Sequence, residues 1–89
     1  MRLSATVSGR VQGVAFRYFT QMKATELGVV GWCMNQRNGT VFVVSEGEKS
    51  ELDRFLRALY EGSPASVVGD VRVEWSEGTG EFKRFRVRR

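Results

Sequence analysis

The chain has 89 residues, 42% hydrophobic and 27% charged, with a net charge of +4. This is the length of a single domain, here residues 1–89, and the composition excludes a disordered or low-complexity chain. No apolar run approaches the ~18 residues that cross a bilayer, and no signal-like stretch opens the sequence, so we expect a soluble cytoplasmic protein with no membrane partner. One cysteine and no histidine exclude an internal disulfide and the usual zinc and iron–sulfur frameworks. We therefore expect no metal and no cofactor.

The first third of the chain predicts a strand, a loop and a helix. Residues 2–8 alternate apolar and polar side chains, which is typical of a strand with one face in the core. A glycine-bounded stretch, residues 9–15, predicts a loop. From Phe16 to Leu27 apolar or small residues recur at helical spacing, and Gly28 stands where a helix C-cap belongs.

The middle of the chain predicts a hairpin and a second helix. Residues 29–35 and 40–46 are rich in β-branched and aromatic residues, and the Asn38-Gly39 pair between them is a strong hairpin signal. Residues 48–60 place leucine and phenylalanine at i, i+3, i+4 and i+7, and Gly62 follows as a stop.

The last third of the chain predicts a fourth strand and, near its end, either a short fifth strand or an extension of the fourth. Residues 69–75 alternate, and residues 85–89 alternate phenylalanine and valine with arginine, which favours a short fifth strand or an extension. The order strand, helix, strand, strand, helix, strand is that of the ferredoxin-like βαββαβ sandwich. We therefore expect an α+β fold with two helices on one face of an antiparallel sheet.

The loop in "SGRVQGVAFR", residues 8–17, is a candidate anion site. Its glycines let the backbone turn closely, and the free N–H groups at the start of the following helix favour negative charge. Arg17 faces the positive end of the helix dipole, a conflict that a bound anion would cancel. The residues alone also fit an ordinary tight turn with an arginine in solvent. Likewise, Asn35 alone fits a strand end that begins a turn, and Cys33 fits a small buried side chain.

Taken together, "SGRVQGVAFR" and the later "GVVGWCMN" with "NGTV" resemble the acylphosphatase family over nearly the whole chain. The resemblance implies hydrolysis of small-molecule acyl phosphates, with inorganic phosphate as product and competing ligand. It implies Arg17 as the phosphate clamp, Asn35 as the residue that positions the attacking water, and a phosphate cradle of main-chain N–H groups. The cradle residues are Arg10, Val11, Gln12, Gly13, Val14 and Ala15. We expect the side chains of Arg10 and Gln12 to take no part.

The implied chemistry fits a chain without a histidine to act as general acid or base. A carboxylate leaving group, with a pKa near ~4, departs without a proton. Asn35 can orient water but cannot accept its proton, so we expect that proton to pass to the phosphate of the substrate. Two positions depart from many family members, which have glycine at Ala15 and valine at Cys33. These changes bear on the tightness of phosphate binding more than on the reaction.

Two other functions compete with this one. RNA-recognition domains share the topology, and the net charge of +4 suits nucleic acid, but the third predicted strand offers one aromatic residue, Phe42, and no basic residue. We therefore expect no nucleic-acid partner, and a monomer. A domain of a larger carbamoyl-transferring protein would call for a cysteine-rich continuation, whereas the sequence ends at Arg89. The basic end of the chain can also attract anionic substrates.

Overall fold

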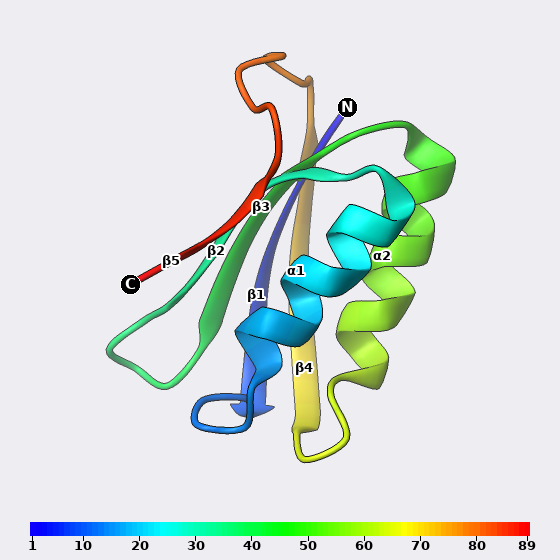
Figure 1. Cartoon of the computed structure of the whole chain (residues 1–89). Coiled ribbons are helices and arrows are strands. Elements are labelled where there is room, and N and C mark those ends of the chain that lie inside the picture. Colours follow the sequence, from blue (N-terminus) through cyan, green and yellow to red (C-terminus); the bar gives the residue numbers. More distant parts are fainter.

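Two helices lie on one face of a five-stranded sheet in the computed structural model, which describes residues 1–89 (Figure 1). In chain order the elements are β1 (Arg2–Arg10), α1 (Phe16–Leu27), β2 (Val30–Asn35), β3 (Val41–Glu46), α2 (Lys49–Glu61), β4 (Val67–Ser76) and β5 (Phe85–Arg88). The strand order is β4-β1-β3-β2-β5. The ferredoxin-like α+β fold predicted from the sequence is confirmed.

The sheet is antiparallel except at one edge. β1 pairs antiparallel with β3 and β4, and β2 pairs antiparallel with β3. β5 lies parallel to β2, so the complete sheet is mixed rather than wholly antiparallel. Because β4 and β5 occupy opposite edges, residues 77–84 must cross the end of the sheet between them, as Figure 1 shows.

The core lies between the sheet and the two helices. Side chains of β1 at alternate positions, Leu3, Ala5 and Val7, are fully or almost fully buried against it. The helices contribute their apolar faces, with Phe16 from α1 and Phe55 from α2 among the largest buried side chains. Burial of a large apolar side chain contributes about 1.5–3 kcal/mol, so these alternating and helical patterns account for the two-layer arrangement.

β1 extends further than the sequence predicted. Residues 2–8 were expected as strand and 9–15 as loop, but β1 continues to Arg10. The register against β4 shifts at Gly9, whose φ of 119° belongs to a region that favours glycine. A Cβ at Gly9 would collide with the carbonyl oxygen of Val67. The bulge therefore keeps the strand paired for two further residues and shortens the loop to residues 11–15.

β4 is longer and more exposed than predicted. It begins at Val67 rather than at residue 69, and Val71 is its only buried side chain. Val73 and Trp75, expected in a half-buried strand, are 37% and 36% exposed. β4 is an edge strand, and at Trp75 it is covered by the ammonium group of Lys49, 4.6 Å from the ring centroid, rather than by apolar side chains.

Both helices end at glycine, as the sequence predicted. Gly28 adopts φ 74° and donates its N–H to the carbonyls of Ala24 and Thr25. The N–H of Gly62 donates to the carbonyl of Ala58. Neither helix is long and apolar enough to cross a membrane.

Candidate active site

The loop between β1 and α1, residues 11–15, is held in place by its side chains. Val11 is 1% exposed and belongs to the core, and Val14 packs against the core from above. The amide nitrogen Nε2 of Gln12 donates to the carbonyl oxygens of Gln36, at 2.8 Å, and Thr40, at 3.0 Å. The sequence predicted no role for the Gln12 side chain, but in the structure its two hydrogen bonds connect this loop to the β2–β3 hairpin.

A second hydrogen bond holds the loop from the turn after α2. The hydroxyl of Ser63, a buried residue after α2, donates to the carbonyl of Val14 at 3.1 Å. No local sequence pattern marks Ser63 as a partner of the first loop. The loop is thus fixed between two distant segments of the chain.

The backbone of the loop is shaped to present N–H groups. Gly13 and Ala15 have positive φ, 74° and 59°, whereas Val14 between them and Phe16 after them do not. Such alternation turns successive N–H groups toward one side, a concavity that suits an anion. No backbone hydrogen bond outside the helices and strands is donated by residues 11–18. α1 also lacks a side-chain cap and has no acidic residue in its first turn.

Arg17 is the second residue of α1, and its side chain reaches β5 at the edge of the sheet. Its Nη1 donates to the carbonyl of Arg88 in β5 at 3.0 Å. Its own carbonyl accepts the thiol of Cys33 in β2 at 3.8 Å. The start of α1 is therefore placed directly over the last residues of β2, and the guanidinium retains further donors.

Asn35 is the last residue of β2 and lies on the face that the helices cover. Its register partner is Val41, a fully buried residue of the core, and two residues earlier Cys33 faces the same way. The side-chain oxygen Oδ1 of Asn35 is the one buried side-chain nitrogen or oxygen atom without a hydrogen-bond partner in the chain. Buried polar atoms are rarely left unpaired, so this oxygen is suited to accept a bond from a molecule outside the chain.

The contacts bring Arg17, Asn35 and the loop to one end of the sheet. Gln12 binds the carbonyl of Gln36, directly after Asn35, and the main-chain carbonyl of Arg17 contacts Cys33, two residues before it. Arg10 lies apart from this group, because it ends β1 as the register partner of Val67 in β4, and its side chain is exposed.

Cys33 is the only thiol, and it is held in its neutral form. Burial raises its pKa from 9.0 to about 12, although the nearby Arg17 acts in the opposite direction. A thiol needs to ionise to be a nucleophile, so Cys33 offers neither a nucleophile nor a base near neutral pH. The thiol is a buried structural side chain, as the sequence suggested.

The strand order and the two helices on one face define a ferredoxin-like α+β sandwich. A model of the acylphosphatase family matches residues 3–87. An acylphosphatase of Pelotomaculum thermopropionicum is 44% identical over 86 residues, spanning 97% of this chain and 94% of that one. The crystal structure of the Bacillus subtilis acylphosphatase superposes with a TM-score of 0.95 at 39% identity, covering 99% of this chain and 98% of that chain. This protein belongs to the acylphosphatase family.

The same fold also occurs as part of a longer protein. Full-length HypF superposes with a TM-score of 0.83 at 27% identity, over 97% of this chain but only 11% of that one. The chain is thus similar to one small part of HypF and to nearly the whole length of the bacterial acylphosphatases.

Proposed function

We propose that this protein hydrolyses acyl phosphates to a carboxylate and inorganic phosphate, as its place among the acylphosphatases indicates. The phosphate is held by main-chain N–H groups of the loop, residues 11–15, and by Arg17, and the attacking water is oriented by Asn35; Arg10, which ends β1, takes no part. The observation that carries the proposal is the buried, unpaired Oδ1 of Asn35 at the strand end that the loop and Arg17 both contact.

Phosphate binding rests on donors that need no proton transfer. The positive φ values at Gly13 and Ala15 turn N–H groups toward one side, and the uncapped start of α1 adds the positive end of a helix dipole. The guanidinium of Arg17 supplies a permanently charged fork that matches two phosphate oxygens. A phosphate dianion would also relieve the unfavourable position of this cation in the first turn of α1.

The reaction itself requires positioning more than acid–base chemistry. Phosphoryl transfer is accelerated mainly by alignment and by stabilisation of the charge on the transferred group. The carboxylate leaving group departs unprotonated, since its pKa is near ~4. Asn35 accepts a hydrogen bond from the water and aligns it, and the proton of the water passes to an oxygen of the substrate phosphate. No side chain of the site has to change its protonation state.

We also propose that the protein acts as a cytoplasmic monomer without metal or cofactor. The backbone donors and Arg17 supply the positive charge that a metal ion would otherwise bring to a phosphate. Size-exclusion chromatography with light scattering tests the monomer. A dimer at micromolar concentration would refute it.

Hydrolysis of benzoyl phosphate, followed spectrophotometrically with inorganic phosphate as competitor, tests the proposed function. Arg17→Gln should lower kcat/KM by at least about 100-fold and abolish inhibition by phosphate, because the charged clamp is lost. Arg17→Lys should recover only part of the activity, since an ammonium lacks the fork. Arg54→Gln removes an exposed cation from α2 and should leave both quantities unchanged. Turnover by Arg17→Gln at the wild-type rate would refute the clamp, and no turnover by the wild type would refute the function.

A further inference from the structure

The face of the sheet opposite the helices carries two neighbouring aromatic side chains. Trp32 in β2 and Phe42 in β3 point to this face, because Cys33 and Val43 beside them are buried toward the helices. The two ring centroids are 5.7 Å apart and the ring planes meet at 60°. Both side chains are partly exposed. We call this surface the open face, made up of Thr6, Trp32, Phe42, Arg72, Arg86 and Arg88.

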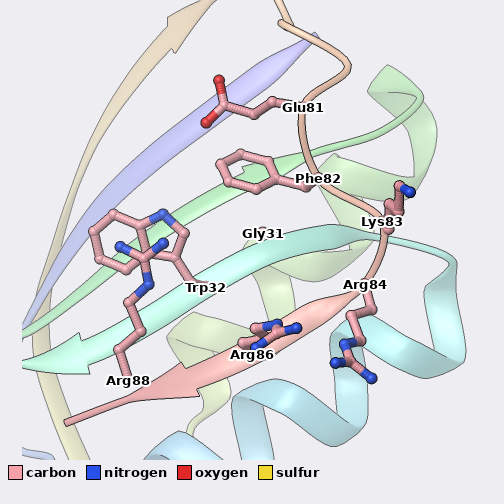
Figure 2. A pocket seen from close by; sticks show the side chains of 8 residues that line it. All are labelled: Gly31, Trp32, Glu81, Phe82, Lys83, Arg84, Arg86 and Arg88. Atoms are coloured by element: carbon pink, nitrogen blue, oxygen red, sulfur yellow. The ribbon is translucent and has the colours of Figure 1, made fainter.

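A basic pocket borders Trp32 on the side of β5. It has a volume of about 470 Å³, and Phe82 adds a second aromatic wall (Figure 2). Its cations are Lys83, Arg84, Arg86 and Arg88, and its one acidic residue is Glu81. The guanidinium carbon of Arg88 lies 4.3 Å from the centroid of the Trp32 ring, so cation and ring are stacked.

A second hollow borders Phe42 on the side of β4. It has a volume of about 340 Å³ and is lined by the hydroxyl residues Ser4 and Thr6 together with Arg72 and Glu74. The aromatic pair therefore stands in the middle of a band that ends in arginine on both sides. Across the two hollows, basic side chains outnumber acidic ones by five to two.

We propose that the open face binds single-stranded RNA. Bases stack on Phe42 and on Trp32, where a base takes the place of the Arg88 guanidinium that covers the ring, and the phosphates contact the cations of the β5 pocket and Arg72. Aromatic rings on a four-stranded sheet with basic side chains around them are the general means by which proteins hold unpaired bases, and each stacked base contributes roughly 1–3 kcal/mol. The hydroxyls of Ser4 and Thr6 beside Phe42 can pair with ribose 2′-hydroxyls, which favours RNA over DNA.

This inference differs from the prediction made from sequence because the register of the hairpin and the position of β5 are set by the tertiary structure. Phe42 was recognised alone in β3, without a basic neighbour in the sequence. The structure places Trp32 of β2 against it, and brings the cations from β5, which pairs with β2 at the edge of the sheet. The phosphate cradle is not involved, since its residues lie at the strand end on the face that the helices cover.

Fluorescence anisotropy of a labelled oligouridylate of about 12 nucleotides measures the binding, and its salt dependence between about 50 and 200 mM counts the phosphate contacts. We expect binding in the micromolar range that weakens as salt rises, and weaker binding of the matching deoxyoligonucleotide. In a Trp75→Phe background the remaining Trp32 should be quenched as RNA binds. Trp32→Leu and Phe42→Leu should each weaken binding by about 5-fold or more, with thermal unfolding and benzoyl phosphate turnover confirming the fold.

Charge is tested with matched pairs. Arg84→Gln with Arg86→Gln should weaken binding and reduce the salt slope, whereas Arg54→Gln with Arg57→Gln, which removes the same charge from exposed positions of α2, should change both less. Equal effects of the two pairs would overturn the proposal, because they would show attraction by net charge alone. So would displacement of the RNA by saturating inorganic phosphate, equal or tighter binding of the deoxyoligonucleotide, or the absence of any salt-dependent anisotropy change.

Discussion

Ala15 is the one residue other than glycine with a positive φ, and it stands at the N-cap of α1. The left-handed conformation costs a side-chain-bearing residue about 1–2 kcal/mol, and such strain is typical of functional loops. Alanine has the smallest side chain after glycine, which limits the free-energy cost of the left-handed conformation. The first loop therefore accommodates Ala15, but the strained conformation of this residue lowers the stability of the fold.

Ala15→Gly should stabilise the fold by about 0.5–1 kcal/mol, because the relief of strain exceeds the extra entropy that glycine loses on folding. Urea denaturation measures the change. Ala24→Gly, in the middle of α1 where φ is helical, provides the contrast and should cost at least about 1 kcal/mol. If Ala15→Gly were less stable than the wild type, the conclusion that Ala15 is strained would be wrong.

Asn35 should contribute to turnover more than to phosphate affinity, since it positions water in the proposed mechanism. Asn35→Ala is expected to lower kcat for benzoyl phosphate by about 100-fold and to change the inhibition constant of phosphate by less than about 3-fold. Asn35→Asp should in addition weaken phosphate binding, because it adds a negative charge at the site. Equal losses of kcat and phosphate affinity in Asn35→Ala would argue for a binding role instead.

At the scale of elements, the β2–β3 hairpin is the support of the first loop. Gln12 binds two carbonyls of the hairpin, and Ser63 binds the loop from the turn after α2. The loop that is proposed to hold phosphate thus depends on two segments distant in the sequence, and its shape is decided where they meet it. Loosening one contact should alter binding without unfolding the chain.

Gln12→Leu removes both hydrogen bonds to the hairpin and should raise KM and the inhibition constant of phosphate by about 10-fold, because the N–H groups lose their fixed orientation. The accompanying loss of stability should be about 1–3 kcal/mol. Asn38→Ala removes the bonds that Thr40 donates at the hairpin tip but keeps both carbonyls that Gln12 binds, and should change phosphate binding less than Gln12→Leu. Unchanged constants in Gln12→Leu would mean that the loop holds its shape unaided.

At the scale of the whole molecule, one buried carboxylate joins the start of β1 to the segment between β4 and β5. Glu46, at the end of β3 and 5% exposed, accepts hydrogen bonds from the Arg2 side chain, from the N–H and hydroxyl of Thr79, and from the N–H of Gly80. These contacts fix the segment that crosses the sheet and leads into β5. Burial by itself would raise the pKa of Glu46, but the hydrogen bonds outweigh it and lower the pKa from 4.5 to about 2.

The pKa of Glu46 is lower in the folded state than in the unfolded state. The carboxylate therefore stabilises the fold at pH values above the pKa of the unfolded state, and this stabilisation is lost as the pH falls toward the pKa of the folded state. The contribution of Glu46 should therefore be complete above pH 4.5 and be lost on acidification toward pH 2. Near pH 6 we expect the free energy of unfolding of the wild type to exceed that of Glu46→Gln by about 2 kcal/mol, a figure reduced because solvent near Arg2 screens part of the interaction. This difference should shrink as the solution is acidified. Thermal unfolding of both proteins across this range measures it. A gap independent of pH would contradict the ionised carboxylate.

Much of the fold was predictable because its signals are local. Alternation gave the burial of Leu3, Ala5 and Val7, helical spacing gave α1 and α2, and glycine marked both helix ends. The resemblance to acylphosphatases, carried by the first loop and the Gly31-Trp32 strand, is borne out by the family model. The roles of Arg17 and Asn35 remain predictions, now supported by the unpaired Oδ1 of Asn35 and by the contact of the Arg17 carbonyl with Cys33 in the same strand.

The amino-acid sequence by itself determined the element order, the core faces and the family, because periodicity, chain reversals and motifs act between residues near in sequence. Only the tertiary structure decided which distant segments meet: β5 parallel to β2, Gln12 and Ser63 against the first loop, and Trp32 beside Phe42 and Arg88. Apart from the pair Trp32 and Phe42, which lie on the two strands of one hairpin, these contacts join positions more than twenty residues apart. They depend on the packing of the whole sheet against both helices, which no short stretch of the chain specifies.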